Sequence, residues 1–340
     1  MNDHAGSIEV VATLDSAPGN VTLGRDGQIY LSLHQFHNPE MRVAELIEGQ
    51  LVPFPTGPEA GLLAFEAVLG IQRDTEDRIW MLDNGSQNAR LPKLVAWDTR
   101  NDRLDRVIYL PPPISTAESF INDLAIDLER NVAYISDPIQ ETSAIIRIDL
   151  ATGLATRVLE GHESVVPEEI DLIIDGVPVQ IEQDDGSLVR PHLGVNGIVI
   201  DANNEWVYLS PMHATGMYRV RSADLSDPSL NPDQLAAAVE RYADKPICDG
   251  ISIDIENNLY VGDLAAGGVG VIKADRTYEL LYQDERLSWT DSFSFGPDGK
   301  LYCDCNQLHR SATLNSGQEA SSPPYYILRL EPLAPGVVGR

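Results

Sequence analysis

The stretch Asp249-Gly-Ile-Ser-Ile-Asp-Ile-Glu-Asn-Asn-Leu-Tyr-Val-Gly-Asp263 indicates the fold, because near-copies of it recur along the whole chain. It reads as an apolar strand, a polar Glu-Asn-Asn turn and a second strand. Six such copies are present, and the second strand of each carries an aromatic marker: Tyr30, Trp80, Tyr134, Tyr208, Tyr260 and Tyr302. The markers recur at intervals of 42 to 74 residues. Repeats of about 40–50 residues with several short strands each are typical of β-propeller blades. The sequence therefore predicts an all-β, six-bladed β-propeller.

The ends of the chain supply a way to close the ring. Each copy provides two strands of a blade, and the residues between copies are expected to provide the outer two. A strand-like run at 8–14 precedes the first copy, and another at 325–331 follows the last one, where the sixth blade lacks its outermost strand. Placing 8–14 outside 325–331 would complete that blade and remove exposed edges. No linker divides the chain, so residues 1–340 are predicted to form one domain.

Two segments depart from the repeat. The longest interval between markers contains an insertion at about 160–190. Within it, residues 170–181 read as a hairpin that turns at Asp175-Gly176 and stands off the third blade. The other segment, 231–243, is expected to be a helix, because Asn231 can cap it and an apolar face follows.

Composition restricts the partners. The chain has 52 acidic and 24 basic residues, a net charge of −28, so its surface should repel nucleic acid and anionic membranes. No apolar run approaches the roughly 18–20 residues of a membrane span, and residues 1–7 do not resemble a secretory signal. Three cysteines do not suggest a disulfide framework. We therefore expect a cytoplasmic protein that acts on a small molecule; its oligomeric state is left open.

The residues that open the first strand of each blade are the first candidates for a functional site. In a propeller these strands line the central channel, so their starting residues converge on one mouth. The positions are occupied by Asn20, Val68, Asn122, Asn196, Asp249 and Asp291. Five of the six carry a side-chain oxygen, the donor that calcium and magnesium prefer. Asn and Asp also cap turns for purely structural reasons, but their recurrence across blades favours a shared site.

Other chemistry-bearing residues have more local explanations. A second aspartate series follows the aromatic markers and is expected to make turn and blade-to-blade hydrogen bonds: Asp83, Asp137, Asp263 and Asp304. Among the histidines, His34, His213 and His309 follow strands and could act as general bases, or could be bystanders in loops. Cys303 and Cys305 lack a partner pair, so a zinc site is not expected there.

Several motifs together resemble a known family. Pro18-Gly-Asn-Val-Thr22, Asn122-Asp-Leu-Ala-Ile-Asp127, Tyr208-Leu-Ser-Pro211 and Asn306-Gln-Leu-His-Arg310 look like bacterial members of the major royal jelly/Yellow family. That resemblance covers nearly the whole chain and implies a six-bladed propeller. Insect members of the family are linked to dopachrome conversion or to the binding of small amines.

The segments that begin at Asn196 and Asp249 also resemble the gluconolactonase/senescence marker family. The resemblance implies that Asn196 and Asp249 are metal ligands and that Asn122 lies close to the substrate. A further ligand in that family is a glutamate opening the first blade, where this sequence has Gly19-Asn20. The implied cofactor is a divalent ion, calcium first, with magnesium, manganese or zinc as alternatives.

Three functions follow as hypotheses. The first is a metal-dependent hydrolase of the lactonase type, in which the ion polarises a carbonyl group. Asp249, Asp291, His34 and His213 are then the expected catalytic residues, and Asn20, Asn122 and Glu66 the expected substrate contacts. The second is a Yellow-like isomerase or tautomerase, since polarising a carbonyl also acidifies the neighbouring C–H bond. The third is a non-catalytic protein that binds a small amine at an acidic channel mouth.

Overall fold

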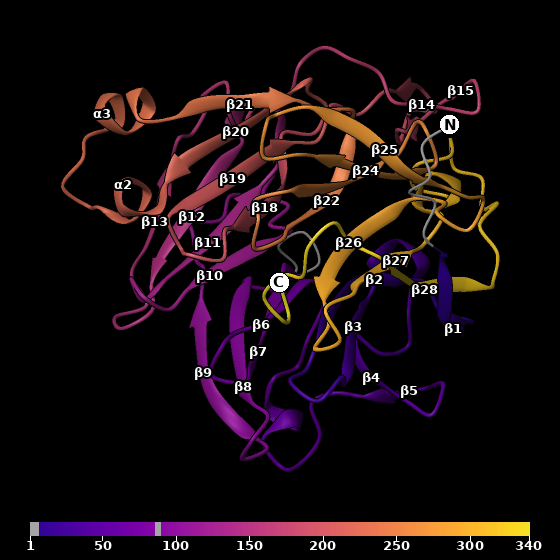
Figure 1. The fold of residues 1–340 in the computed structure, drawn as a ribbon, viewed down its shortest axis with the longest axis horizontal. Helices are drawn as coiled ribbons and strands as arrows, with labels where there is room; N and C mark the ends of the chain where they lie inside the picture. The colour runs from indigo at the N-terminus through magenta and orange to yellow at the C-terminus, as the bar shows by residue number, and fades with distance from the viewer. Residues whose placement is uncertain (1–6, 86–89) are drawn as a thin grey trace.

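The computed structural model describes residues 7–85 and 90–340, and its strands form six four-stranded antiparallel sheets in a ring (Figure 1). The first blade comprises β2 (Pro18–Leu23), β3 (Ile29–Leu33), β4 (Val43–Ile47) and β5 (Gln50–Pro53). The second comprises β6 (Val68–Arg73), β7 (Arg78–Asp83), β8 (Lys93–Asp98) and β9 (Arg103–Tyr109). The third comprises β10 (Leu124–Asp127), β11 (Val132–Asp137), β12 (Ala144–Asp149) and β13 (Ala155–Val158).

The remaining blades repeat the pattern. The fourth comprises β18 (Val195–Ile200), β19 (Trp206–Pro211), β20 (Gly216–Arg221) and β21 (Glu240–Asp244). The fifth comprises β22 (Cys248–Ile253), β23 (Leu259–Asp263), β24 (Gly268–Ile272) and β25 (Tyr278–Gln283). The sixth comprises β26 (Thr290–Phe295), β27 (Leu301–Cys305), β28 (Tyr325–Leu330) and β1 (Glu9–Leu14). The predicted six-bladed propeller is confirmed.

The core of the molecule is divided among the blade interfaces. One buried apolar cluster lies between each pair of neighbouring blades, and each of these clusters contains one aromatic marker of the repeat. Tyr134 of the third blade, for example, packs against Val195 and Leu209 of the fourth. The marker of every blade thus faces the next blade around the ring. Burying a large aromatic side chain at each interface explains why the repeat keeps an aromatic residue at this position.

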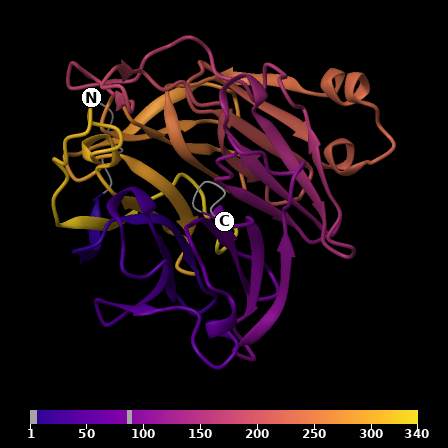
Figure 2. The ribbon, with the colours of Figure 1, turned by 180° about the vertical axis from the view of Figure 1, so that it is seen from behind.

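The ring is closed at both ends of the chain. Strand β1 pairs antiparallel with β28, and Leu14 lies opposite Tyr325. Near the other terminus, the carbonyl of Gly339 accepts a hydrogen bond from Thr22 (2.9 Å) and that of Arg340 from the amide of Phe295 (2.8 Å). The C-terminal end accordingly lies at the middle of the ring, both in Figure 1 and from behind in Figure 2.

The insertion forms two small hairpins, β14 (Ile173–Ile174) with β15 (Val177–Pro178) and β16 (Ile181–Glu182) with β17 (Leu188–Val189). The expected turn at Asp175-Gly176 is present, and both residues have positive φ, as a tight hairpin turn requires. The sequence suggested that the insertion stands off the third blade, but it does more than that. It reaches the sixth blade, where the amide of Gln180 donates to the carbonyl of Leu314 (3.2 Å).

The helical segments are shorter than expected. Helix α3 covers only Pro232–Ala237, with Asn231 and Gln234 forming a capping box. The rest of the segment predicted as a helix, Glu240–Asp244, is strand β21, because the edge of the fourth blade offers it a partner strand. Helix α2 (Ser222–Ser226) was not predicted. Residues 7–85 and 90–340 also contain four 3-10 turns: η1 (Gln35–His37), η2 (Ala60–Leu62), η3 (Gln140–Thr142) and η4 (Leu308–Arg310). In the part of the chain described, no helix is long and apolar enough to cross a membrane.

Candidate functional site

A cavity of about 340 Å³ lies at the mouth of the channel where the inner strands begin. Its wall is mostly apolar, built from three aromatic side chains and from side chains of the insertion and the neighbouring loops: Phe36, Phe120, Trp289, Leu172, Val179 and Met212. The insertion therefore contributes to the wall of the cavity. Its base is polar and contains four of the residues predicted from the inner strands: Asn122, Asn196, Asp249 and Asp291.

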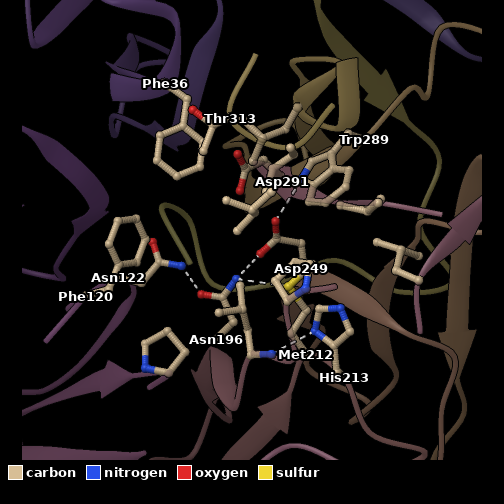
Figure 3. A pocket seen from close by; sticks show the side chains of 18 of the residues that line it. Phe36, Phe120, Asn122, Asn196, Met212, His213, Asp249, Trp289, Asp291 and Thr313 are labelled. Carbon is tan, nitrogen blue, oxygen red and sulfur yellow. Dashed lines mark hydrogen bonds between the residues drawn. The ribbon is translucent and has the colours of Figure 1, made fainter. Parts of the chain in front are cut away.

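These polar side chains are linked to one another (Figure 3). The Nδ2 group of Asn122 donates to Oδ1 of Asn196, whose own Nδ2 group donates to Oδ1 of Asp249. The second carboxyl oxygen of Asp249 accepts a hydrogen bond from Nε1 of Trp289 (2.8 Å). Strands β18 and β22, together with the segments just before β10 and β26, thus place one continuous chain of hydrogen bonds at the base of the cavity. Because each side chain restrains the next, the carboxyl group of Asp249 is held in a fixed orientation.

Asp291 extends this chain into the sixth blade. Its carboxyl group shares a hydrogen bond with that of Asp249, and Nδ2 of Asn306 donates to its Oδ2 atom. Burial raises the pKa of Asp249 to about 7, and burial together with the neighbouring Asp249 raises the pKa of Asp291 well above its usual range. Neither carboxyl group forms an ion pair with an arginine or lysine among the described residues. Two such groups close together cannot both ionise easily, so the pair is suited to holding and transferring a proton.

Two glycines explain how the blades bring these residues so close. Gly197 follows Asn196, and a Cβ atom at Gly197 would lie 2.9 Å from the carbonyl oxygen of Asp249. Gly250 follows Asp249, and a Cβ atom there would overlap the backbone of Asp291. The Asn-Gly and Asp-Gly pairs seen in the sequence are therefore packing requirements as well as possible ligand motifs. Each glycine lets the next inner strand approach the channel axis.

Both predicted histidines also line the cavity. His34 and His213 are buried, and burial lowers their pKa values to about 3 and about 4. The Nδ1 atom of His34 accepts a hydrogen bond from the amide of Phe36 (3.2 Å), and that of His213 from the amide of Leu193 (3.0 Å). Since a backbone amide can only donate, Nδ1 is unprotonated in both rings, and the neutral imidazoles carry their proton on Nε2.

Two other predicted contacts lie elsewhere. Asn20 faces a narrow space further along the channel axis, together with Asp123 and Arg340, and is not part of the cavity wall. Glu66 forms an ion pair with Arg90 (2.6 Å) and does not line the cavity either. The structure therefore brings together Asn122, Asn196, Asp249, Asp291, His34 and His213, and leaves Asn20 and Glu66 outside.

The second aspartate series makes the structural contacts that the sequence predicted. Asp83 accepts hydrogen bonds from the amides of Glu66 and Ala67 (3.0 Å each) and pairs with Lys93. Asp137 accepts from the amide of Phe120 (3.0 Å), and in this way holds an aromatic residue of the cavity wall.

Further members of this aspartate series make similar contacts. Asp263 accepts hydrogen bonds from the amide of Ala266 (3.0 Å) and the hydroxyl group of Tyr278 (2.6 Å). Asp304 accepts from the amide (2.9 Å) and hydroxyl (2.5 Å) of Ser292. The third histidine weighed from the sequence, His309, stacks on Trp289 outside the cavity wall, with ring centroids 6.0 Å apart.

Trp289 is the main residue that sequence reasoning missed. It lies two positions before Asp291, adopts a positive φ of 60° and donates to Asp249. A bulky residue in this backbone conformation is strained, and such strain is concentrated at functional sites. The available signal was a tryptophan next to a channel-mouth aspartate. The sequence does not show that the Trp289 side chain points at Asp249, because this orientation depends on the left-handed backbone conformation of Trp289.

The base of the cavity carries some, but not all, of the oxygen ligands that a divalent cation needs. Asn122, Asn196, Asp249 and Asp291 offer amide and carboxyl oxygens, which calcium accepts. A cation would also compensate two buried acids for which the described residues supply no basic partner. No cluster of three or more His, Cys, Asp or Glu side chains with metal-binding geometry occurs in residues 7–85 and 90–340. A metal would thus be held largely through amide oxygens, which points to a weak site.

The chain is similar to a family of known proteins. The model of the family described as "Major royal jelly protein" matches residues 67–310, which is more than half of the chain. No curated protein sequence matches.

Solved structures share the fold. A luciferin-regenerating enzyme matches with a TM-score of 0.60 and 11% identity, over 98% of both chains. Regucalcin from Agrobacterium tumefaciens, described as a calcium-binding protein, matches with a TM-score of 0.58 and 14% identity, over 96% of this chain and 97% of that one. A gluconolactonase from Xanthomonas campestris gives 0.56 and 11%, over 96% and 90%. At these identities the likeness shows the fold alone.

Proposed function

The chain belongs to the major royal jelly protein family, and from that premise we propose that it is a small-molecule hydrolase of the lactonase type. The observation that carries the proposal is the hydrogen-bonded carboxyl pair of Asp249 and Asp291 at the polar base of an otherwise apolar cavity. A cyclic ester with an apolar body matches both parts of this cavity. The fold shared with a protein described as a gluconolactonase supports the same reading.

The carboxyl pair supplies the proton transfers that hydrolysis of a lactone needs. In the reactive state one carboxyl group is ionised and the other protonated. The ionised group takes a proton from a water molecule as the water oxygen forms a bond to the carbonyl carbon. When the ring C–O bond breaks, the protonated group gives its proton to the leaving alkoxide. One proton enters the pair and one leaves it, so the product is a hydroxy acid and the pair needs only an internal proton shift to be restored.

The remaining polar residues orient these groups. Asn122 and Asn196 fix Asp249 through their side-chain amides, and Trp289 holds its other oxygen. If a divalent ion binds, Asn196 and Asp249 would hold it with Asn122, and it would polarise the carbonyl oxygen of the substrate. Asp291 would then be the stronger base, because a carboxylate bound to a metal is a weak one.

The test is an assay of the purified protein against aromatic, aliphatic and sugar lactones, after chelation and again with calcium, magnesium, manganese or zinc. We expect hydrolysis of at least one class and a loss of about a hundredfold or more in kcat for Asp249→Asn, the size typical of a lost general base. Asp284→Asn, at a partly exposed ion pair with Arg286, is the matched control and should retain full activity. An absence of hydrolysis of every lactone, with every ion, would overturn the proposal.

A second function is favoured by a specific observation. The same carboxyl pair lies in a cavity walled by Phe36, Phe120 and Trp289, which suits a flat aromatic ring. Such a pair can also remove a proton at one carbon and return it at another, as in a Yellow-like isomerase or tautomerase. Conversion of dopachrome-like substrates without hydrolysis of lactones would select this function. Tight binding of an aromatic amine with no turnover of any substrate would instead select the amine-binding function.

A further inference from the structure

The first hairpin of the insertion has two unlike faces. Leu172 and Val179 are 2% and 6% exposed, and both line the cavity. Their near neighbours Ile173 and Val177 are 48% and 61% exposed. The two inward residues are joined through their backbones, since the amide of Val179 donates to the carbonyl of Leu172 (3.0 Å). One face of this hairpin therefore forms part of the apolar cavity wall, and the other face is open to solvent.

The sixth blade holds this inward face in place. The amide of Gln180 donates to the carbonyl of Leu314 (3.2 Å), and the carbonyl of Gln180 accepts from the amide of Ser316 (3.0 Å). On the cavity side, Val179 belongs to a buried apolar cluster that also contains Trp289. Backbone hydrogen bonds and apolar packing thus fix the same short segment, so its side chains are a permanent part of the wall.

The polar groups of the cavity base are engaged with one another. The side-chain amides of Asn122 and Asn196 donate along the chain that leads to Asp249, and Asp291 accepts from Asn306. Few donors and acceptors remain for a ligand, and these lie together at the base. A ligand with hydroxyl groups all around its ring would leave several of them against the apolar wall without a partner, which is unfavourable.

The charge of the cavity is equally selective. Glu118, Asp249 and Asp291 line it, whereas no arginine or lysine of the described residues does. The buried Lys245 is not part of the wall, and its ammonium group donates to backbone carbonyls, including that of Ala214 (3.0 Å). A carboxylate on the ligand would therefore meet acidic groups without a compensating base.

We infer that the cavity selects an uncharged, apolar compound of one or two rings with a single ester or ketone group, and that Leu172 and Val179 set this specificity. The inference rests on the proposed function, since it names the substrate class of the same cavity. Ligand cavities commonly measure about 300–1,000 Å³, so 340 Å³ suits a small ligand. Phe36 and Phe120, with ring centroids 6.1 Å apart, offer aromatic surface to a flat ring. The class includes aromatic lactones and excludes sugar lactones.

The first test is calorimetry of the native protein with three ligands that cannot be hydrolysed: β-tetralone, a carboxylate derivative of β-tetralone, and gluconolactam. We expect β-tetralone to bind most tightly and each of the other two to bind about tenfold or more weakly, because of the unpaired charge or hydroxyl groups. Equal or tighter binding of either comparison ligand would overturn the inference, and so would an absence of β-tetralone binding at millimolar concentration.

The second test concerns the insertion. Val179→Thr replaces a methyl group by a hydroxyl group of similar size, and should weaken the binding of β-tetralone about three- to tenfold. Val177→Thr makes the same change on the outer face and should leave the affinity unaltered. If Val179→Thr does not fold, Ile181→Thr changes a half-buried position of the same wall, with the same expectation. An unchanged affinity in the folded variant would show that the insertion does not set specificity.

Neither measurement depends on turnover, so this inference and the proposed function can fail separately. A protein that hydrolyses no lactone but prefers β-tetralone as described would refute the proposed hydrolase and leave the ligand class standing. Hydrolysis of sugar lactones in preference to aromatic lactones would support the hydrolase and overturn the inference.

Discussion

Four aspartates near the propeller axis set the electrostatic character of the molecule at the scale of single residues. Burial raises the pKa values of Asp123, Asp249 and Asp304 to about 7 and that of Asp291 well above its usual range. In an unfolded chain these groups ionise near pH 4. Between the unfolded pKa near 4 and the raised folded pKa, the folded state therefore binds more protons than the unfolded state. Each of these groups makes the protein less stable as the pH rises through this interval.

Asp304 provides a test of this effect away from the candidate ligands. Asp304→Asn keeps the shape and the acceptor for Ser292 but removes the titration. The melting temperature of the variant should therefore rise relative to that of the native protein as the pH increases from 5 to 8. The expected change in unfolding free energy is at most about 1.4 kcal/mol per pH unit.

Asp284→Asn is the control, because hydrogen bonds from Arg286 lower the pKa of that carboxyl group and it is ionised in both states over this range. Its melting temperature should differ from that of the native protein by the same amount at every pH. A difference for Asp304→Asn that does not change with pH would show that this carboxyl group titrates normally.

At the scale of the strand, the inner edge of each blade is shaped by its neighbour. Gly250 lies in β22, and a Cβ atom there would lie 2.1–2.7 Å from backbone atoms of Asp291 and Ser292 in β26. A methyl group there must push two inner strands apart. Gly250→Ala should therefore cost about 1–3 kcal/mol of unfolding free energy, the usual price of overpacking. It should also reduce activity, because it separates Asp249 from Asp291.

Gly61→Ala is the matched control in chemical denaturation. Gly61 has open space where its Cβ atom would lie and needs no positive φ, so this change should alter stability by less than about 0.5 kcal/mol. Equal stability of the two variants would mean that the inner strands adjust freely, and that the Asp-Gly pair has no packing role.

At the scale of the whole molecule, closure of the ring depends on one strand from the beginning of the chain. In β1, Leu14 is 3% exposed and packs in the interface between the sixth and first blades, whereas Val10 is 38% exposed. Leu14→Ala should lower the unfolding free energy by about 2–5 kcal/mol, as for other buried leucines. Val10→Ala, in the same strand and the same pairing with β28, should cost less than about 1 kcal/mol.

Thermal unfolding of both variants would check this expectation. Similar, small effects of the two changes would mean that β1 contributes little to closure and that the contacts of residues 335–340 suffice. A much larger effect of Leu14→Ala would show that the first and last blades depend on this strand.

The sequence by itself determined the number of blades, the order of their strands and four residues at the base of the cavity: Asn122, Asn196, Asp249 and Asp291. These features follow from local patterns, because a strand–turn–strand repeat shows which residue begins each inner strand. The ring of blades then brings the first residues of the inner strands together. The aromatic markers were equally readable, since each blade interface needs a large buried side chain.

The tertiary structure alone decided the rest. Whether 240–244 is a helix or a strand depended on a free blade edge, and the place of the insertion depended on its contact with the sixth blade. The orientation of Trp289 and the protonated nitrogen of His213 depend on backbone groups from other segments. Such features arise from contacts between residues distant in the sequence, and a local pattern does not specify them.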